Sequence, residues 1–138
     1  MALPQAAEAR VFYQSATQRW IDAEILLREG RTTGATYLAG YSVVCMLKSL
    51  ILSTVASSRR QEILTTFLGG RAHDYAWLKM IYLKNGGFPF PASIFKHFAL
   101  AERWTTALRY QSGALDIRDA GGFMKAAKSI MDWIDGRL

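Results

Sequence analysis

The sequence predicts an all-α protein, arranged as an up-and-down bundle of four long helices with one or two short helices. Three observations favour this fold. Apolar residues recur at helical spacing through most of the 138 residues. Alternating β-branched runs, which indicate strands, are absent. The connections are short, so successive helices should be antiparallel neighbours, and residues 1–138 are expected to form one domain.

The first helix is predicted from Pro4 to Glu29, because proline suits a helix start and Gly30 is a good stop signal. The segment 31–34, RTTG, is expected to be a connector, and a second helix should run from Ala35 to Ala56. The buried face of the first helix is marked by Phe12, Ala16, Trp20, Ala23 and Leu27.

The second helix contains the run YLAGYSVVCMLKSLIL at residues 37–52, in which Gly40 and Lys48 are unexpected. Glycine weakens a helix by about 1 kcal/mol relative to alanine, so Gly40 is expected to let a neighbouring helix approach closely. The run is long enough to cross a membrane. Lys48 near a bilayer centre would cost roughly 2.5–3.5 kcal/mol, so we expect a core helix and no membrane.

Lys48 is open to two interpretations. In the structural one, its stem is packed while its amine reaches the surface or a carboxylate. Asp74, Asp116 and Asp119 are the candidate carboxylates. In the functional one, Lys48 shares a cleft with Tyr41 and contacts a phosphate.

The rest of the chain predicts shorter helices and a final long one. A short helix should follow Ser58, which could form a capping box with Gln61. GGFPFP at residues 86–91 is a clear break. The remaining helices are predicted over about His73–Lys84, from Pro91 or Ser93 to about Tyr110, and over Ala120–Gly136 with Asp119 as its cap.

Charge and cysteine content limit the function classes. The net charge is +6, and residues 30–110 hold ten basic and three acidic residues, so an anionic partner is expected near the middle of the chain. The only cysteine, Cys45, excludes an intrachain disulfide and a multi-cysteine zinc site. Together with the lack of a signal-peptide pattern at the start, this predicts a reducing, cytoplasmic location.

Several short signatures, in order, resemble the HEPN family (higher eukaryotes and prokaryotes nucleotide-binding domain). The most specific is ATYLAGYSVVCMLKSLIL, which is similar to that family's A-x-Y-x-A-G-Y-x-x-E-C-x-L-K-x-L helix. Val44 stands where the family often has Glu, so any role of that carboxylate is lost. The other signatures are WIDAEILLREG, RAHDYAWL, ERWTTALRY and DAGGFMKAAKSIMDWI.

The resemblance implies a bundle of four or five helices, commonly dimeric. Some members are metal-independent ribonucleases with Arg, four to six residues, then His, in which histidine moves a proton and arginine stabilises the phosphate. This spacing requires an arginine at residues 66–68 for His73 or at 90–92 for His97, and neither segment has one. Other members bind nucleotides or accompany a small nucleotidyltransferase in two-gene systems, including toxin–antitoxin pairs.

The sequence supplies candidates for binding an anion or nucleotide but none for catalysis, a metal or a cofactor. Arginine beside an aromatic ring can grip phosphate and stack a base. The structural alternatives are that Arg109 complements a helix dipole, that Tyr110 packs on a neighbouring helix and that Asp74 caps a helix. The candidates are Tyr41, Lys48, Arg71, His73, Asp74, Arg109 and Tyr110.

Three functions follow as hypotheses. The first is a non-catalytic HEPN-like module that binds a nucleotide, RNA or a nucleotidyltransferase partner in a toxin–antitoxin-like system. The second is a ribonuclease with a different constellation, such as His73 with Arg71 or Arg109. The third is a structural module that forms a homodimer through apolar surface. A nucleophilic pair of Cys45 and His73 is disfavoured, because a cysteine on an apolar stripe is usually a core residue.

Overall fold

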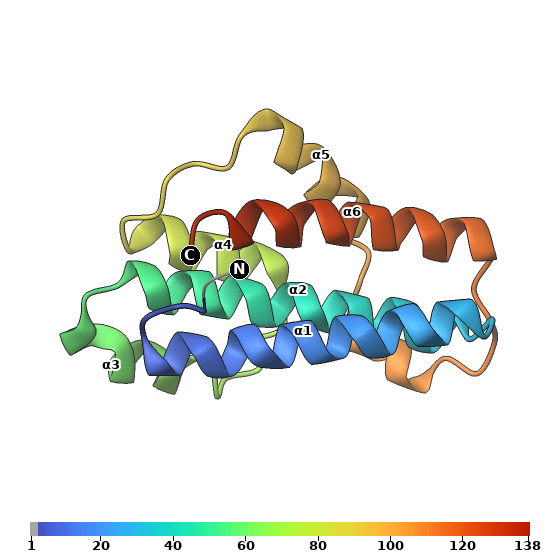
Figure 1. Cartoon of the computed structure of the whole chain (residues 1–138), viewed down its shortest axis with the longest axis horizontal. Coiled ribbons are helices and arrows are strands. Elements are labelled where there is room, and N and C mark those ends of the chain that lie inside the picture. Colours follow the sequence, from blue (N-terminus) through green and yellow to red (C-terminus); the bar gives the residue numbers. More distant parts are fainter. Residues whose placement is uncertain (1–2) are drawn as a thin grey trace.

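The computed structural model describes residues 3–138 and contains helices but no strand in that range, which confirms the all-α prediction (Figure 1). The chain folds into six α-helices and two short 3₁₀ helices. They are α1 Ala7–Arg28, α2 Thr32–Thr54, η1 Ser57–Arg59, α3 Arg60–Thr66, α4 Tyr75–Lys84, α5 Ala92–Ala101, η2 Thr106–Tyr110 and α6 Ile117–Asp135.

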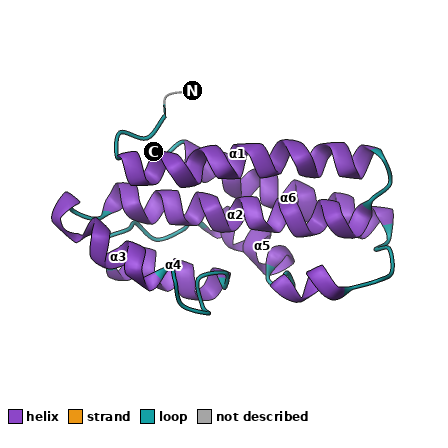
Figure 2. Ribbon diagram, turned by 90° about the horizontal axis from the view of Figure 1, so that it is seen from below, coloured by secondary structure: helices purple, strands orange, loops and turns teal. Residues whose placement is uncertain are grey.

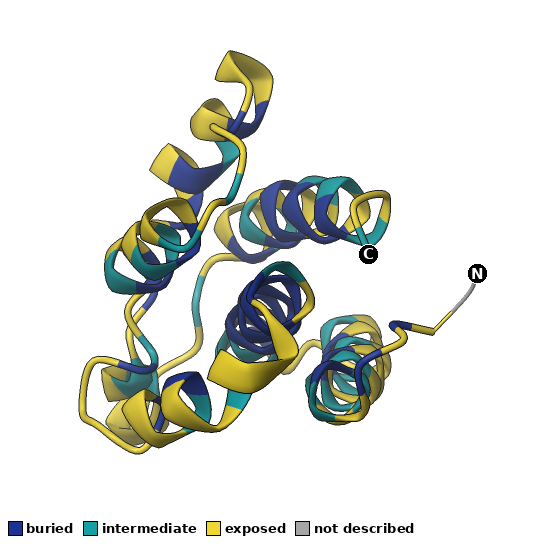
Figure 3. Ribbon diagram, turned by 90° about the vertical axis from the view of Figure 1, so that its left-hand side faces the viewer, coloured by how far each residue is buried: buried dark blue, intermediate teal, exposed yellow. Residues whose placement is uncertain are grey.

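Helix α2 is the centre of the bundle. It packs against α1, α6, α4 and η2, while α5 packs against α6. Every residue from Ser42 to Leu52 is buried, and the corresponding ribbon is dark blue in the middle of Figure 3. By length and composition α2 could also cross a membrane, but 83% of its apolar window is covered within the bundle. Core helices of soluble proteins pass the same test.

Helices α1 and α2 run side by side along most of their length (Figure 2). Three fully buried alanines, Ala9, Ala16 and Ala23, recur every seven residues on α1. Such small side chains let the two backbones come close. The approach is direct enough for the Ser49 hydroxyl on α2 to donate a hydrogen bond of 2.9 Å to the Ala9 carbonyl.

The predicted start of the second helix is wrong, because the segment expected to be a connector belongs to it. Helix α2 begins at Thr32. The Thr32 hydroxyl donates a hydrogen bond of 2.7 Å to the Leu115 carbonyl. The Thr33 hydroxyl donates one of the same length, 2.7 Å, to the Gly113 carbonyl. These hydrogen bonds connect the first turn of α2 to a loop that is distant in sequence. The segment RTTG by itself carries no signal of that contact.

Three other predicted helix starts also move. Helix α1 begins at Ala7, three residues after Pro4. The capping box of Ser58 and Gln61 does not form, because Ser58 lies inside η1 and its side chain makes no cap hydrogen bond. Asp116 caps α6 by accepting from the Arg118 amide at 2.7 Å, so Asp119 lies within the first turn.

The helix predicted to end at Tyr110 is interrupted. Helix α5 ends at Ala101, and the chain turns before η2 begins at Thr106. The reason is Trp104, which is 6% exposed and reaches back across the bundle to α2. A continuous helix would not bring this side chain to α2, and the turn places η2 against α2.

Candidate functional site

The site is built around Gly40 of α2, which makes room for the indole of Trp104. A Cβ at Gly40 would overlap the indole ring. The prediction that a neighbouring helix approaches at Gly40 is therefore wrong, since a single side chain occupies that space. Trp104 Nε1 donates to the Tyr37 carbonyl at 3.2 Å, and the Tyr75 hydroxyl donates to the Gly40 carbonyl at 2.9 Å. Both hydrogen bonds fix aromatic rings directly to the α2 backbone.

Aromatic rings from four segments meet at this point. Trp104 is stacked on Tyr75, with centroids 5.5 Å apart, and on Tyr37 at 6.0 Å. Tyr41 meets Trp104 edge-on at 5.8 Å. His73 lies on the other side of Tyr41, with ring centroids 5.2 Å apart. Such edge and offset contacts are the preferred arrangements of aromatic rings, so the cluster is well packed.

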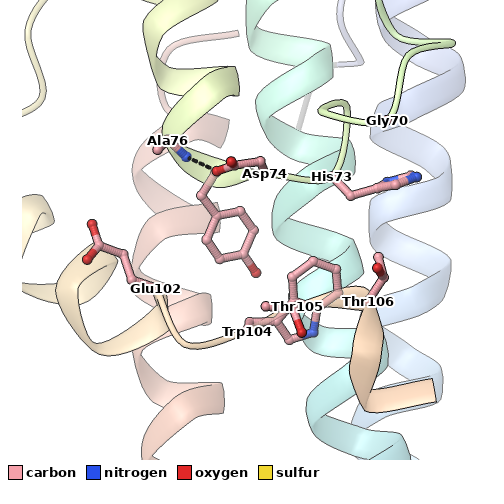
Figure 4. A pocket seen from close by; sticks show the side chains of 9 residues that line it. Gly70, His73, Asp74, Ala76, Glu102, Trp104, Thr105 and Thr106 are labelled. Carbon is pink, nitrogen blue, oxygen red and sulfur yellow. Dashed lines mark hydrogen bonds between the residues drawn. The ribbon is translucent and has the colours of Figure 1, made fainter. Parts of the chain in front are cut away.

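A cleft of about 510 Å³ opens beside this cluster (Figure 4). Its size falls within the range typical of small-molecule sites. The Asp74 carboxylate accepts from the Ala76 amide at 2.9 Å, which confirms the prediction that Asp74 caps a helix. The cleft is lined by Gly70, His73, Asp74, Tyr75, Ala76, Glu102, Trp104, Thr105 and Thr106.

His73 is the basic group in the lining. Its Nε2 lies 3.4 Å from the Tyr41 hydroxyl, and its buried Nδ1 has no hydrogen-bond partner among residues 3–138. Burial lowers the pKa of His73, and the charges of Lys48 and Arg109 lower it further. The imidazole is therefore held in its neutral form near pH 7.

Arg109 stands next to the cleft. Its Nε donates to the carbonyl of Thr106, a lining residue, at 3.1 Å, which is the interaction expected at a helix end, although the helix is the short η2. Its charge acts on both Tyr41 and His73. The guanidinium lies 5.3 Å from the ring of Tyr110. Tyr110 is 81% exposed, so the prediction that it packs on a neighbouring helix is wrong.

The structure therefore places Tyr41, His73, Asp74 and Arg109 in or next to the cleft. Arg71 and Lys48 lie elsewhere. Arg71 is exposed in the turn before His73 and does not line the cleft. Lys48 lines a separate pocket. Within residues 3–138 its amine forms no ion pair with a carboxylate, so the expected partners Asp74, Asp116 and Asp119 are wrong. It lies instead over the rings of Phe12 and Phe67.

Other chemistry at the site is limited. Cys45 is buried, and burial raises the pKa of its thiol, so the nucleophilic thiolate is disfavoured. In the described part of the chain, no group of three or more His, Cys, Asp or Glu side chains is placed to hold a metal ion.

The sequence did not identify Trp104, Glu102, Thr105 or Thr106 as parts of the site. Three of them lie in the turn that was expected to be helical, which would have pointed them to different faces. The available signal was Gly40, since a glycine in a buried helix indicates that a bulky group approaches its backbone. It could not indicate which group.

Comparisons of the chain with protein-family models, with curated proteins and with solved structures give no match. The arrangement of the side chains is therefore the basis for a functional proposal.

Proposed function

We propose that this chain is a non-catalytic HEPN-like module that binds a nucleotide, free or as part of an RNA, in the cleft beside His73. The observation that carries the proposal is a cleft of suitable size, lined by His73, beside which Arg109 donates to the carbonyl of the lining residue Thr106. In an RNA, the exposed ring of Tyr110 beside the Arg109 guanidinium adds a surface outside the cleft on which a second base can stack.

The charges around the cleft favour one orientation of such a ligand. Asp74 and Glu102 line the cleft, and two carboxylates disfavour a phosphate inside it. The same oxygens can accept hydrogen bonds from the amino group of a base. We therefore assign the base to the cleft and the phosphate to Arg109 at its edge.

Calorimetric titration of the full chain with ATP, UTP and a short single-stranded RNA tests the proposal. We expect ATP, whose base carries an amino group, to bind more tightly than UTP. Arg109→Ala should weaken ATP binding by about tenfold, as expected for a charge-assisted hydrogen bond. Arg137→Ala is the matched control, because Arg137 also lies over an aromatic ring, 4.8 Å from Trp133, and should leave binding unchanged. Equal losses in both variants would indicate unspecific attraction to a basic protein and would refute the site.

The proposed partner of the module is a small nucleotidyltransferase in a toxin–antitoxin-like pair. The support is the ordered set of family-like signatures in the sequence. The test is co-purification with the product of the neighbouring gene. A neighbour of another class, or no complex, would contradict this part of the proposal while leaving nucleotide binding testable by itself.

Ribonuclease activity is a second candidate, favoured by a neutral His73 in the lining of a cleft and by Arg109, which donates to Thr106 of the same lining. A neutral imidazole can accept the proton of a ribose 2′-hydroxyl, and a guanidinium can stabilise the developing phosphate charge. RNA cleavage that disappears in His73→Ala but persists in His97→Ala would establish this activity. If the purified protein leaves RNA intact, the non-catalytic proposal stands.

Homodimer formation is a third candidate, favoured by exposed apolar side chains around α4 and α5. Met80, Leu83 and Phe95 line a groove of about 670 Å³ whose walls consist mainly of apolar atoms. A contiguous patch of this kind is uncommon on a monomer. Light scattering should give a dimer that Met80→Ser with Phe95→Ser converts to a monomer. The exposed side chains are Met80, Leu83, Phe88, Phe95 and Leu100.

A further inference from the structure

A second pocket, separate from the cleft beside His73, lies where α3 meets the first half of α1 and the second half of α2. Its volume is about 440 Å³. In Figure 1, α3 lies at the end of the bundle where α1 begins and α2 ends. The lining is mostly apolar and contains one charged group, Lys48. Its members are Phe12, Lys48, Gln61, Leu64, Thr65, Phe67 and Leu68.

Lys48 is 6% exposed, yet no side chain of the described residues neutralises it. Its Nζ lies 5.5 Å from the centroid of the Phe12 ring and 5.3 Å from that of Phe67. The negative faces of two rings offset part of the cost of removing an ammonium from water. They do not replace a counter-ion, and burial lowers the pKa of Lys48 as a result.

Lys79 shows how the same chain completes a similar arrangement. Its Nζ also lies over two phenylalanine rings, 4.4 Å from Phe98 and 5.8 Å from Phe95. There a carboxylate is supplied by Glu102, whose Oε1 is 3.9 Å from the amine. At Lys48 no carboxylate of the described residues pairs with the amine, and the side chain instead lines a pocket with mostly apolar walls.

We propose that this pocket binds a small apolar carboxylic acid, such as a medium-chain fatty acid, whose carboxylate pairs with the Lys48 amine. The walls formed by Phe12, Leu64 and Phe67 suit an apolar chain. Leu68, which is 87% exposed at the rim, gains a partner when a chain extends out of the pocket. A nucleotide is a poorer fit, because the many polar atoms of its sugar and phosphates would find only Lys48, Gln61 and Thr65 as polar partners among phenylalanine and leucine side chains.

Calorimetric titration of the full chain with octanoate, below its micelle concentration, tests the proposal. We expect saturable binding of one octanoate per chain. Lys48→Met, which keeps the length and apolar character of the stem, should weaken binding by about tenfold or more. Lys79→Met is the matched control, because it removes the other lysine that lies over two phenylalanines, and should not change the affinity.

Two measurements on the unchanged protein make the test independent of how the variants fold. Octanol has the same chain without the charge and should bind at least about tenfold more weakly than octanoate. Octanoate binding near pH 9 should take up protons, seen as a dependence of the heat on the ionisation enthalpy of the buffer, because a bound carboxylate favours the charged amine.

The proposal is overturned if octanoate shows no saturable binding, if octanol binds equally well, or if Lys48→Met retains full affinity. Equal binding of octanol would indicate unspecific association with apolar surface only. The outcomes are distinguishable from those for nucleotide binding, because the probe is octanoate and neither Arg109 nor His73 lines this pocket.

Discussion

Each half of α2 has one basic group set among aromatic rings, His73 beside the first half and Lys48 within the second. The surroundings of the two groups differ. Against the first half, His73 contacts the Tyr41 hydroxyl, within a cluster whose indole and phenol groups hydrogen-bond to the α2 backbone. In the second half, Lys48 belongs to the helix itself and lies between two phenylalanines, which offer no hydrogen bond. In both places burial is the main cause that lowers the pKa of the basic group.

The difference lies in how the two groups can respond to burial. An imidazole near pH 7 loses its charge readily, and its neutral form can still hydrogen-bond to a tyrosine. An ammonium starts from a pKa of about 10.4, so burial must lower its pKa much further than that of an imidazole before the group is neutral at pH 7. The first half of α2 is thus specified by hydrogen bonds, whereas the second half retains an electrostatic cost that an external anion could remove.

The largest expected effect is on the first half. Gly40→Ala should lower the free energy of unfolding by about 3 kcal/mol, because the new methyl group would overlap the Trp104 indole, which is held on both faces. Urea unfolding followed by circular dichroism measures the change.

Gly122→Ala is the control for this substitution. A Cβ at Gly122, within α6, meets nothing within 4 Å. Alanine there should raise the free energy of unfolding by about 0.5–1 kcal/mol, since it is the better helix former. If both variants behaved alike, the close approach of Trp104 to Gly40 would be refuted.

The second half should respond in the opposite direction. Lys48→Met should raise the free energy of unfolding by about 1 kcal/mol at pH 7, because it removes a buried charge that has no counter-ion. The folded-state pKa of Lys48 is lowered, so between that pKa and about 10.4 the unfolded chain binds more protons. The stability of the unchanged protein therefore rises with pH in this window, and the advantage of Lys48→Met should shrink there.

Lys79→Met provides the comparison for this prediction. The ion pair between Lys79 and Glu102 is long, and the Glu102 side chain is largely exposed. Lys79→Met should therefore lower the free energy of unfolding by no more than about 0.5 kcal/mol. A loss of several kcal/mol in Lys48→Met would instead mean that the amine satisfies a buried acid.

The smallest effect concerns the acid side of neutral pH. Because the folded-state pKa of His73 is lowered, the unfolded chain binds more protons just below pH 6.5. Stability should therefore fall as the pH drops through this window, by about 0.5 kcal/mol or less because the ring is partly solvated. Thermal melts of His73→Gln should show a flatter dependence between pH 7 and about pH 5. An unchanged slope would contradict the burial of the imidazole.

Much of the fold could be predicted because it depends on local signals. Apolar spacing predicts the six α-helices, and Asp74 is expected to cap a helix because it stands where one opens. The errors arose where distant contacts decide the structure. The first turn of α2 includes Thr32, whose hydroxyl donates a hydrogen bond to a loop carbonyl more than eighty residues away. Helix α5 ends early because the Trp104 side chain must reach α2.

The candidate site was predictable only in part, for the same reason. Residue chemistry indicates His73, Asp74 and Arg109. The first two line one cleft, and Arg109 donates to the carbonyl of Thr106 in its lining. For Lys48 residue chemistry leaves two interpretations open, and its position along α2 directs it toward α1 and α3, away from that cleft. Sequence reveals which groups are reactive, but the rotation of a helix about its axis decides which of them meet.

The burial of Cys45 at the centre of α2 has a practical consequence. The chain has one thiol, and burial both shields it and raises its pKa. A thiol reagent can therefore modify the protein only during excursions in which α2 separates from its neighbours. The rate of that modification reports how often the whole bundle opens, without any engineered label, and would register the binding of a ligand at either pocket as a slower reaction.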